Sequence, residues 1–364
     1  MATADVTVMG GGIFGLAIAY ALGLRGAKVR LIERHHVGAG SSGGLVGALA
    51  PHVPENWNPK KAFQLESLLM AGDFWSGVQG RSGIDPGYLR RGRLQPLVDE
   101  RAVDQARRRI EGARLHWKGR AEWSVGPAPD ADWAGTSPTG LFAFDGLTAR
   151  LHPRQAAKAL AGAIRALGGM VEELNEPVDG DGRRMPPAGI FESRKWDGPV
   201  IWATGLAGLR DISDDLGGAV GGGVKGQAAL LACEARDMPQ LFVDGLHIVP
   251  HLDGTVAIGS TSEREWTDPS ATDEALDGLI EKARVACPML RTAPVIERWA
   301  GVRPRAASRA PMLGRWPGRE GHFIANGGFK IGFGMAPKVA EVMADLVLEG
   351  RDIIPAGFRV EDCL

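Results

Sequence analysis

The stretch Val6–Arg34 reads VTVMGGGIFGLAIAYALGLRGAKVRLIER, and it decides the fold class. Residues 6–9 predict a short buried strand, the apolar run over 13–24 predicts a buried helix, and 28–33 predict a second strand. Glycines separate the first strand from the helix in the spacing G-x-G-x-x-G, at Gly10, Gly12 and Gly15. A strand, a glycine turn, a helix and a strand within about 30 residues predict a Rossmann-like dinucleotide-binding unit.

The three glycines have separate functions in such a unit. One permits the tight turn, one lets the backbone approach a pyrophosphate, and one lets the helix pack closely on the strand. The N-terminus of the helix offers N–H groups to the phosphates. Glu33 ends the second strand, where its carboxylate would accept a hydrogen bond from a ribose 2′-OH. The motif does not choose between NAD and FAD, and a tight turn without a ligand is the alternative.

Composition narrows the class of protein. The chain has 364 residues, which favours two domains, and its 42 basic and 43 acidic residues leave no basic excess for nucleic acid or an anionic membrane. No apolar run is long enough to span a membrane, and no segment before the first strand is long enough for a signal peptide. Three widely spaced cysteines without a C-x-x-C pair argue against a metal or iron–sulfur centre: Cys233, Cys287 and Cys363. We therefore expect a cytoplasmic protein that holds no metal.

The rest of the chain alternates between two kinds of pattern. Helical spacing predicts helices over 61–80, 102–119, 153–167, 272–287 and 337–349, the last with Pro337 in its first turn. Buried strands of the nucleotide-binding type are predicted at 170–174, in VIWATG and in HFIANGG. KGQAALLACEA and LHIVPHLDGTVAIGSTSE alternate like antiparallel strands, with Asp253-Gly254 as a hairpin turn. Elements of the nucleotide-binding type occur at both ends and in the middle of the chain, and the antiparallel strands lie between them. This order predicts two interleaved domains.

Six separated motifs occur in a fixed order along the chain. They are VMGGGIFG…LIER, GAGSSGGLVGALAPH, VIWATGLAG, KGQ, HIVPHLDGTVAIGST, and WAGVRPRAASRAPMLG…GGFKIGFGMAP. Together they resemble the FAD-dependent D-amino-acid oxidase (DAO) superfamily, and within it the glycine oxidase and sarcosine oxidase branch. The resemblance covers nearly the whole chain, and its C-terminal block is the most diagnostic part.

This resemblance implies both a fold and a reaction. The fold is α/β plus α+β: a Rossmann-like FAD-binding domain (1–88, 151–222 and 296–364) is interleaved with a substrate domain (89–150 and 223–295) built on a large antiparallel sheet. The reaction is oxidation of the C–N bond of an amino acid or a carboxylate-bearing amine, such as glycine, sarcosine or a D-amino acid. A hydride passes to flavin N5, the imine hydrolyses, and the electrons go to O2 or another acceptor. The sequence leaves open whether the protein forms a homo-oligomer.

Three residues are expected to act on the substrate. Arg303, in WAGVRPR, matches the family position that binds the substrate carboxylate, and a guanidinium can make two parallel hydrogen bonds there. A structural salt bridge is the alternative for Arg303. Lys330 matches a position where related oxidases place a cation, although a solvated surface lysine is equally expected. His247 stands on the hairpin where glycine-oxidase-like members present an aromatic or hydroxyl group. Arg305 is expected to be a surface charge or a charge just behind the residues that contact the substrate.

The remaining expected site residues line the substrate pocket or hold the cofactor. His52, Ala48 and Ser262 are expected in a substrate pocket that is roomier than one built for glycine, although a lone histidine is more often structural. The C-terminal glycine loop and the helix after it would face the flavin edge that becomes negative on reduction. PRAASRAPM has no cysteine for a covalent bond, which favours non-covalent FAD. The expected cofactor-binding residues are Gly10, Gly12, Ile13, Phe14, Gly15, Glu33, Arg34, Gly40, Ser41, Ser42, Val178, Ala203, Thr204, Gly205, Gly328, Lys330, Ile331, Gly332, Phe333 and Gly334.

Four alternatives stay open. A dehydrogenase of the same fold would use a quinone or another acceptor in place of O2. FAD aromatic hydroxylases and halogenases share the opening motif, but GGFKIGFG replaces the G-D pair they usually carry. An RNA-modifying oxidase that acts on a carboxymethylamino nucleoside is disfavoured by the neutral charge. A nucleotide-binding protein without activity is disfavoured by Arg303 beside a complete flavin loop.

Overall fold

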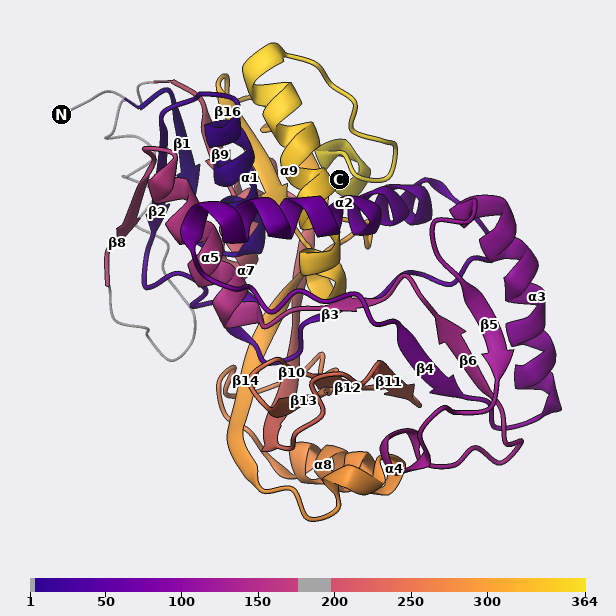
Figure 1. The fold of residues 1–364 in the computed structure, drawn as a ribbon. Helices are drawn as coiled ribbons and strands as arrows, with labels where there is room; N and C mark the ends of the chain where they lie inside the picture. Colours follow the sequence, from indigo (N-terminus) through magenta and orange to yellow (C-terminus); the bar gives the residue numbers. More distant parts are fainter. Residues whose placement is uncertain (1–3, 176–197) are drawn as a thin grey trace.

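Two large sheets organise the chain in the computed structural model, which describes residues 4–175 and 198–364 (Figure 1). The expected adenine-contacting residue Val178 lies outside the described residues. One sheet draws strands from the start, middle and end of the chain, and the other draws its strands from the segments between. This alternation confirms the predicted fold class of a Rossmann-like unit interleaved with a largely antiparallel sheet.

The six-stranded sheet carries the glycine motif. Its order is β15-β16-β9-β1-β2-β8, and all neighbours are parallel except β15 and β16. β1 lies inside the sheet and is buried on both faces. Strands of this kind are apolar on both faces, and VTVM is apolar except for Thr7. The strands span Val6–Met9 (β1), Val29–Glu33 (β2), Met170–Glu173 (β8), Val200–Trp202 (β9), Met312–Arg315 (β15) and His322–Asn326 (β16).

The eight-stranded sheet has the order β14-β10-β13-β12-β11-β4-β6-β5, with β11 and β4 as its parallel pair. Two 12-residue strands, β10 and β14, pair along their length and run from the six-stranded sheet down to α8 (Figure 1). The strands span Arg93–Pro96 (β4), Trp123–Gly126 (β5), Phe142–Asp145 (β6), Gly221–Ala232 (β10), Gln240–Val243 (β11), Leu246–Pro250 (β12), Thr255–Gly259 (β13) and Val295–Ala306 (β14).

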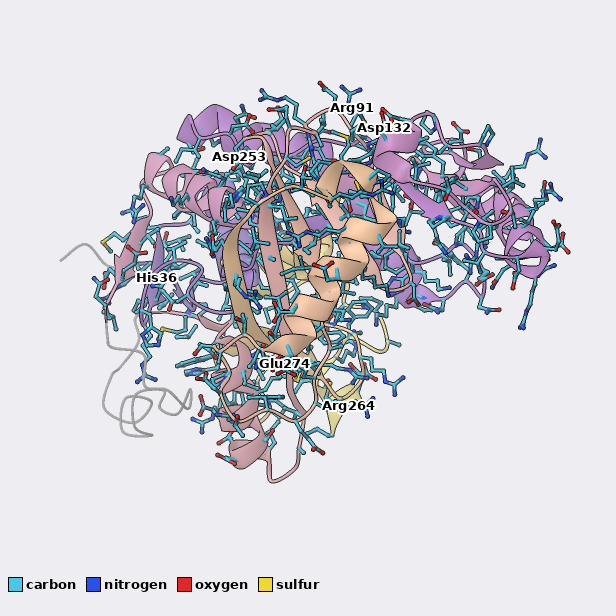
Figure 2. All side chains as sticks on the ribbon, turned by 90° about the horizontal axis from the view of Figure 1, so that it is seen from below. His36, Arg91, Asp132, Asp253, Arg264 and Glu274 are labelled. Carbon is cyan, nitrogen blue, oxygen red and sulfur yellow. The ribbon has the colours of Figure 1, made fainter. Side chains whose placement is uncertain are left out.

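Helices cover both sheets. α1, α2, α5 and α9 pack on one another beside the six-stranded sheet, and α1 is buried over most of its surface because it is apolar nearly all round. Seen from below, α8 lies across the eight-stranded sheet (Figure 2). The helices span Ile13–Leu24 (α1), Pro59–Ser82 (α2), Glu100–Trp117 (α3), Ala131–Ala134 (α4), Pro153–Ala166 (α5), Gly205–Leu216 (α7), Glu274–Ala286 (α8) and Gly332–Glu349 (α9).

Short elements complete the chain. The two-stranded pair β3 (Ala48–Leu49) and β7 (Ala149–Arg150) is antiparallel. Single 3₁₀ turns form η1 (Ser41–Gly43), η2 (Pro288–Leu290), η3 (Phe329–Ile331) and η4 (Val360–Cys363).

Most predicted elements are confirmed, one helix begins earlier than predicted, and some elements, β14 and α7 among them, were not predicted. α9 begins at Gly332, five residues before the predicted start, so Pro337 lies inside the helix and not in its first turn. The glycine at position 334 lets this first turn pack closely on α2, since a Cβ there would lie 3.3 Å from Leu68 Cδ2. α7 was not predicted, because the glycines in ATGLAGL are more typical of a turn than of a helix.

The predicted domain boundaries stay a prediction. The boundary at 295/296 would assign β14 to the FAD-binding domain, whereas β14 pairs with β10 in the eight-stranded sheet. Strand pairing therefore favours a later boundary, near the end of β14.

Candidate functional site

The glycine turn between β1 and α1 is tightly packed at two of its three motif positions. Gly10 has φ +106°, and a Cβ there would lie 2.4 Å from the carbonyl oxygen of Ala203. A Cβ on Gly15 would lie 1.9 Å from the carbonyl oxygen of Gly10. At Gly12, in contrast, the nearest atom would be Ser42 Oγ at 3.4 Å. Packing alone therefore requires the first and third glycines, while the second leaves the backbone accessible at the helix N-terminus.

Glu33 and Ser42 are brought to this turn from separate segments. Glu33 Oε2 accepts a hydrogen bond from Gly11 N at 2.5 Å, and Oε1 accepts one from His35 N at 3.0 Å. Ser42 Oγ accepts a hydrogen bond from Ile13 N at 3.0 Å. The structure thus places the predicted carboxylate over the turn and the 40–42 loop at the N-terminus of α1, with Arg34 directly after Glu33.

The C-terminal glycine loop packs against the same end of α1. A Cβ on Gly328 would lie 2.9 Å from Phe14 Cζ, and one on Gly332 would lie 3.4 Å from Ile13 Cγ2. The N-termini of α1 and α9 therefore lie close together, and each presents the positive end of its helix dipole. Ile331 and Phe333, from the same loop, pack partly buried against the core beneath.

The third expected segment closes the turn from the other side. Ala203 N donates to Met9 O at 2.8 Å, so Ala203 continues from β9 directly beside the glycine turn. Thr204 precedes α7, and the Gly205 carbonyl accepts a hydrogen bond from Asn326 Nδ2 at 2.8 Å. These residues, Glu33, the 40–42 loop and the two helix N-termini form a cradle with glycines where a Cβ would clash. This arrangement fits the pyrophosphate and ribose of FAD.

Arg303 lies on β14 with its guanidinium turned across the neighbouring strand. Nη1 donates to Ser260 Oγ at 2.6 Å, and Nη2 donates to the carbonyl oxygens of Thr261 at 2.7 Å and Lys225 at 3.1 Å. Nε is buried and has no hydrogen-bond partner in the described parts of the chain. Burial lowers the pKa of Arg303 to about 10, against a smaller opposing effect from Glu263, so the guanidinium remains charged at neutral pH.

The acceptors of Arg303 are themselves fixed. Gln227 is fully buried on β10; its backbone N donates to Thr261 Oγ1 at 2.8 Å, and its Nε2 donates to Glu263 Oε1 at 3.1 Å. Glu263 Oε2 also lies 3.6 Å from the Nζ of buried Lys225. Ser262, expected in the substrate pocket, is exposed within this segment. Ser260, which contacts Arg303, stands two residues before Ser262 in GSTSE and was not among the predicted site residues.

His247 stands on β12 opposite Phe242 of β11, with ring centroids 4.7 Å apart. Burial lowers its pKa to about 3, and the nearby charges of Arg93 and Lys330 act in the same direction. The imidazole is therefore neutral above pH 4, and its Nδ1 is buried without a partner among residues 4–175 and 198–364. Arg93 is paired with buried Asp145 at 3.0 Å, so its charge is largely compensated.

Lys330 is exposed to solvent over much of its side chain, but partial burial and the charge of Arg303 lower its pKa. Lys330 influences His247, and Arg303 influences Lys330, so the three predicted catalytic residues lie in one electrostatic neighbourhood. Phe329 lies among them, since the Arg303 Cζ stands 5.7 Å and the Lys330 Nζ 5.8 Å from its ring centroid. Phe329 lies within GGFKIGFG and was not among the predicted site residues.

His52 and Ala48 have other contacts. The His52 backbone N and ring Nδ1 both lie within hydrogen-bond distance of Gln64 Oε1, at 2.7 and 2.5 Å. Burial lowers the pKa of His52, which keeps the imidazole neutral at pH 7. Ala48 pairs with Arg150 between β3 and β7. In the described chain, no hydrogen bond or ring contact joins His52 to Arg303 or His247, so its contacts are those of a structural histidine.

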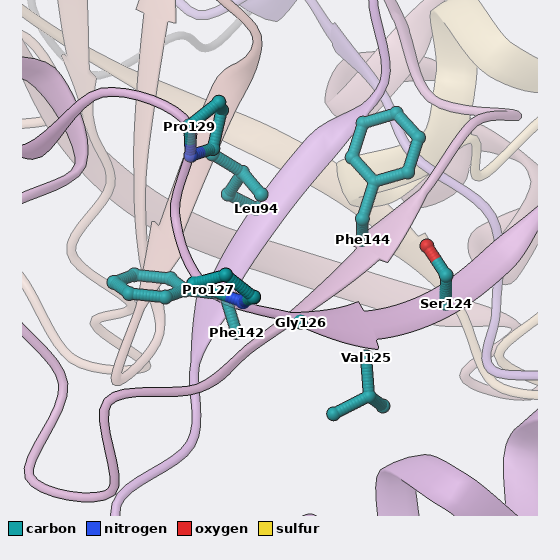
Figure 3. A pocket seen from close by; sticks show the side chains of 8 residues that line it. All are labelled: Leu94, Ser124, Val125, Gly126, Pro127, Pro129, Phe142 and Phe144. Carbon is teal, nitrogen blue, oxygen red and sulfur yellow. The ribbon is translucent and has the colours of Figure 1, made fainter.

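A separate surface pocket of about 200 Å³ lies at the β5 edge of the eight-stranded sheet (Figure 3). None of the predicted site residues lines it. Its lining is mostly apolar and consists of Leu94, Ser124, Val125, Gly126, Pro127, Pro129, Phe142 and Phe144.

The described residues contain neither a metal-binding cluster nor a membrane-spanning helix. No group of three histidine, cysteine, aspartate or glutamate side chains is placed to hold a metal ion. Over 4–175 and 198–364, no helix has both the length and the apolar character of a membrane span.

Comparisons with known proteins agree with this cradle. A sequence model of the DAO family, described as FAD dependent oxidoreductase, matches residues 5–346. Glycine oxidases from Pseudomonas aeruginosa and Geobacillus kaustophilus are 27% and 26% identical, over 96% and 94% of this chain and 96% and 92% of theirs. The crystal structure of the Geobacillus kaustophilus glycine oxidase superposes with a TM-score of 0.82 at 22% identity, covering 99% of both chains. That of iminodiacetate oxidase from Chelativorans sp. BNC1 superposes with a TM-score of 0.78 at 21% identity, over 97% of this chain and 98% of that one. With a family match over most of its length and a flavin cradle built from the matching segments, the chain belongs to the DAO family of FAD-dependent oxidoreductases.

Proposed function

We propose that this oxidoreductase oxidises the C–N bond of a small amino acid, or of an amine that carries a carboxylate, with Arg303 binding that carboxylate. The supporting observation is the Arg303 guanidinium, which is charged, half-buried and without a carboxylate partner in the described chain. The glycine oxidases among its relatives act on an amino acid of this kind.

Arg303 keeps two of its five N–H donors available. Three are used by Ser260, Thr261 and Lys225, which leaves Nε–H and one N–H on Nη1. The free N–H on Nη1 donates a charge-assisted hydrogen bond to a substrate carboxylate, while the three internal bonds hold the guanidinium in place. A fixed carboxylate orients the adjacent C–H bond, and orientation of this kind contributes several kcal/mol to catalysis.

His247 receives the substrate amine. Its neutral imidazole has an unpartnered nitrogen, which accepts a hydrogen bond from an amine N–H and adds no positive charge beside Arg303. The substrate loses a hydride from carbon and a proton from nitrogen, and the resulting imine hydrolyses to a carbonyl compound and ammonia or an amine. Lys330 contributes positive potential at the same place, which favours anionic substrates.

FAD is held non-covalently by the glycine turn, Glu33, the 40–42 loop and the start of α9. Bound there, FAD would supply the two-electron acceptor for the hydride, and O2 or another acceptor such as a quinone would take up the electrons. The N–H groups at the start of α9 would stabilise negative charge on the flavin edge. We further propose that the protein is cytoplasmic. Within the FAD-binding domain, Glu33 would bind the ribose 2′-OH of FAD, and the start of α9 would face the flavin edge.

The test is anaerobic mixing of the yellow holoenzyme with glycine, sarcosine, D-amino acids and other carboxylate-bearing amines, with flavin absorbance as the readout. A substrate bleaches the flavin whichever acceptor is physiological. In Arg303→Ala the flavin content should be retained, while kcat/KM falls by about 100-fold, because charge-assisted hydrogen bonds to the carboxylate are lost. Peroxide release on admitting air would support the oxidase over the dehydrogenase.

Arg298→Ala is the matched control. Arg298 stands on the same strand, exposed and paired with Asp277 at 2.7 Å, so its removal should leave kcat/KM unchanged. Unaltered kinetics in Arg303→Ala would refute the assignment of the carboxylate to Arg303.

A further inference from the structure

Three cationic side chains of the described residues lie near one aromatic ring, that of Phe329. The Arg303 Cζ, the Arg305 Cζ and the Lys330 Nζ stand 5.7, 5.5 and 5.8 Å from the centroid of Phe329. Each distance is within the range in which the negative face of a ring attracts a cation. The positive charge at the candidate site is thus greater than Arg303 alone provides.

The fold brings these groups together by strand register. Arg303 and Arg305 are two residues apart on β14, so both side chains point to one face of the strand. An isolated antiparallel bridge between Arg305 and Gly328 brings the start of η3 alongside the edge of β14. Phe329 follows with φ +47°, a left-handed conformation that is uncommon for an aromatic residue. Such outliers concentrate at ligand sites, where packing maintains them.

These cations lack the acidic partners that other surface arginines have. Arg298 and Arg359 each form an ion pair with an aspartate, at N–O distances of 2.7 and 2.6 Å, and Arg319 forms an ion pair with Asp215. For Arg305 and Lys330, no carboxylate of residues 4–175 and 198–364 lies within 4.0 Å. The like charges instead act on one another, since Arg303 lowers the pKa of Lys330.

The positive region extends outward from Arg305. Burial and the charges of Arg305 and Arg309 lower the pKa of Lys60, at the start of α2. A substrate with one carboxylate would neutralise the charge of Arg303 and leave Arg305 and Lys330 uncompensated beside it. A second anionic group on the substrate, a few bonds away from the first carboxylate, would compensate the charges of Arg305 and Lys330.

We propose that Arg305 and Lys330 bind a second carboxylate of the substrate, so that the enzyme acts on amino or imino dicarboxylates. The proposal rests on the proposed function, in which Arg303 binds the first carboxylate. Phe329 separates the two anion positions and supports the cations from beneath. The glycine-sized half of the substrate lies toward His247, and the second carboxylate lies toward the exposed side, where Lys330 stands.

The turnover experiment compares two secondary amines that share an N-substituted glycine. Iminodiacetate carries a second carboxylate where N-ethylglycine carries a methyl group. With the holoenzyme, kcat/KM should be roughly tenfold or more higher for iminodiacetate, mainly through KM, because charge-assisted hydrogen bonds are added. In Arg305→Met and in Lys330→Met this ratio should fall toward one, and in the control Arg298→Met it should stay at the wild-type value. A wild-type ratio near one, or a ratio that neither variant changes, would overturn the proposal.

A binding experiment separates this proposal from the proposed function. Malonate and propionate differ by one carboxylate, and each is titrated into the holoenzyme with the flavin spectrum and the melting temperature as readouts. Malonate should bind roughly tenfold more tightly, and Arg305→Met should remove the difference. Equal binding of malonate and propionate, or sulfate binding as tight as that of malonate, would overturn the dicarboxylate site even if no amine bleached the flavin. If malonate is preferred while every amine leaves the flavin oxidised, the proposed function fails and the second anion site stands.

Discussion

The guanidinium of Arg303 lies directly over Gly226 of the neighbouring strand. A Cβ on Gly226 would come within 2.2 Å of Arg303 Nη2 and within 2.4 Å of Cζ. Gly226 is therefore part of the site although it has no functional group, because any side chain at this position occupies the place of the guanidinium.

Gly226→Ala should displace the guanidinium while leaving the charge and the strand pairing in place. A shift of about 1 Å in a group that orients a substrate can lower turnover by about 100-fold. We expect kcat/KM for a carboxylate-bearing amine to fall by roughly that factor while flavin content stays at the wild-type level. Steady-state kinetics and flavin absorbance measure the two effects separately.

Gly222→Ala is the matched control for this substitution. Gly222 stands on β10 as Gly226 does, and a Cβ there would meet no atom within 4 Å. Its kinetics should match those of the wild type. Equal activity of the two alanine variants would show that the site tolerates a displaced Arg303.

A second prediction concerns the stability of α9. The carboxylate of Asp345 is 1% exposed and lies 2.6 Å from Arg25 Nη1 and 2.8 Å from Arg351 Nη2. In Arg25→Met/Arg351→Met the carboxylate would stay buried without a cation, and the free energy of unfolding should fall by about 3–5 kcal/mol. Urea unfolding with saturating FAD measures this change.

Neutralising the buried carboxylate should reverse that loss. Adding Asp345→Asn to the double variant should restore most of the stability, because no buried charge remains. Glu349 contacts the same two arginines at 3.4 Å but is 52% exposed, so Glu349→Gln should change the free energy of unfolding by less than about 1 kcal/mol. Small and additive losses in the arginine variants would contradict a buried-charge effect.

A third prediction follows from the buried histidines. Burial lowers the pKa of His251 to about 3, with a smaller contribution from the charge of His152, and burial lowers that of His247 to a similar value. Well above pH 6.5 both imidazoles are neutral in the folded and unfolded states, so they do not make the free energy of unfolding depend on pH. Below pH 6.5 the unfolded chain binds protons that the folded chain does not, so stability decreases until about pH 3, by up to about 1.4 kcal/mol per pH unit for each histidine.

Urea unfolding between pH 7 and pH 5 measures this slope. His251→Gln should make the slope shallower, because one histidine that takes up a proton on unfolding is removed. His36, an exposed histidine labelled in Figure 2, is the control, and His36→Gln should leave the slope unchanged. The idea is wrong if His251→Gln and the wild type lose stability in parallel as the pH falls.

Local sequence pattern determined much of the fold. The glycine turn, the helix after it and the strand that ends at Glu33 lie in one short stretch, so spacing and apolar periodicity were sufficient to predict them. The Asp253-Gly254 hairpin was likewise predicted from a turn preference, and Gly254 has φ +81°. The order of the predicted elements along the chain was sufficient to predict two interleaved domains, and the resemblance of six motifs added the expectation that Arg303 lies at the site.

Only the tertiary structure decided which distant residues meet. Arg303 contacts Ser260, 43 positions away, and Ser42 reaches the helix N-terminus at Ile13, 29 positions away. Likewise, Phe329 lies beneath Arg305 because a bridge joins β14 to the loop before η3. Such contacts depend on strand register and side-chain packing between segments far apart in the chain, and neither periodicity nor turn preference carries that information. The sequence alone thus determined the elements and the class of cofactor, while the charge and shape of the substrate site were decided by how those elements pack.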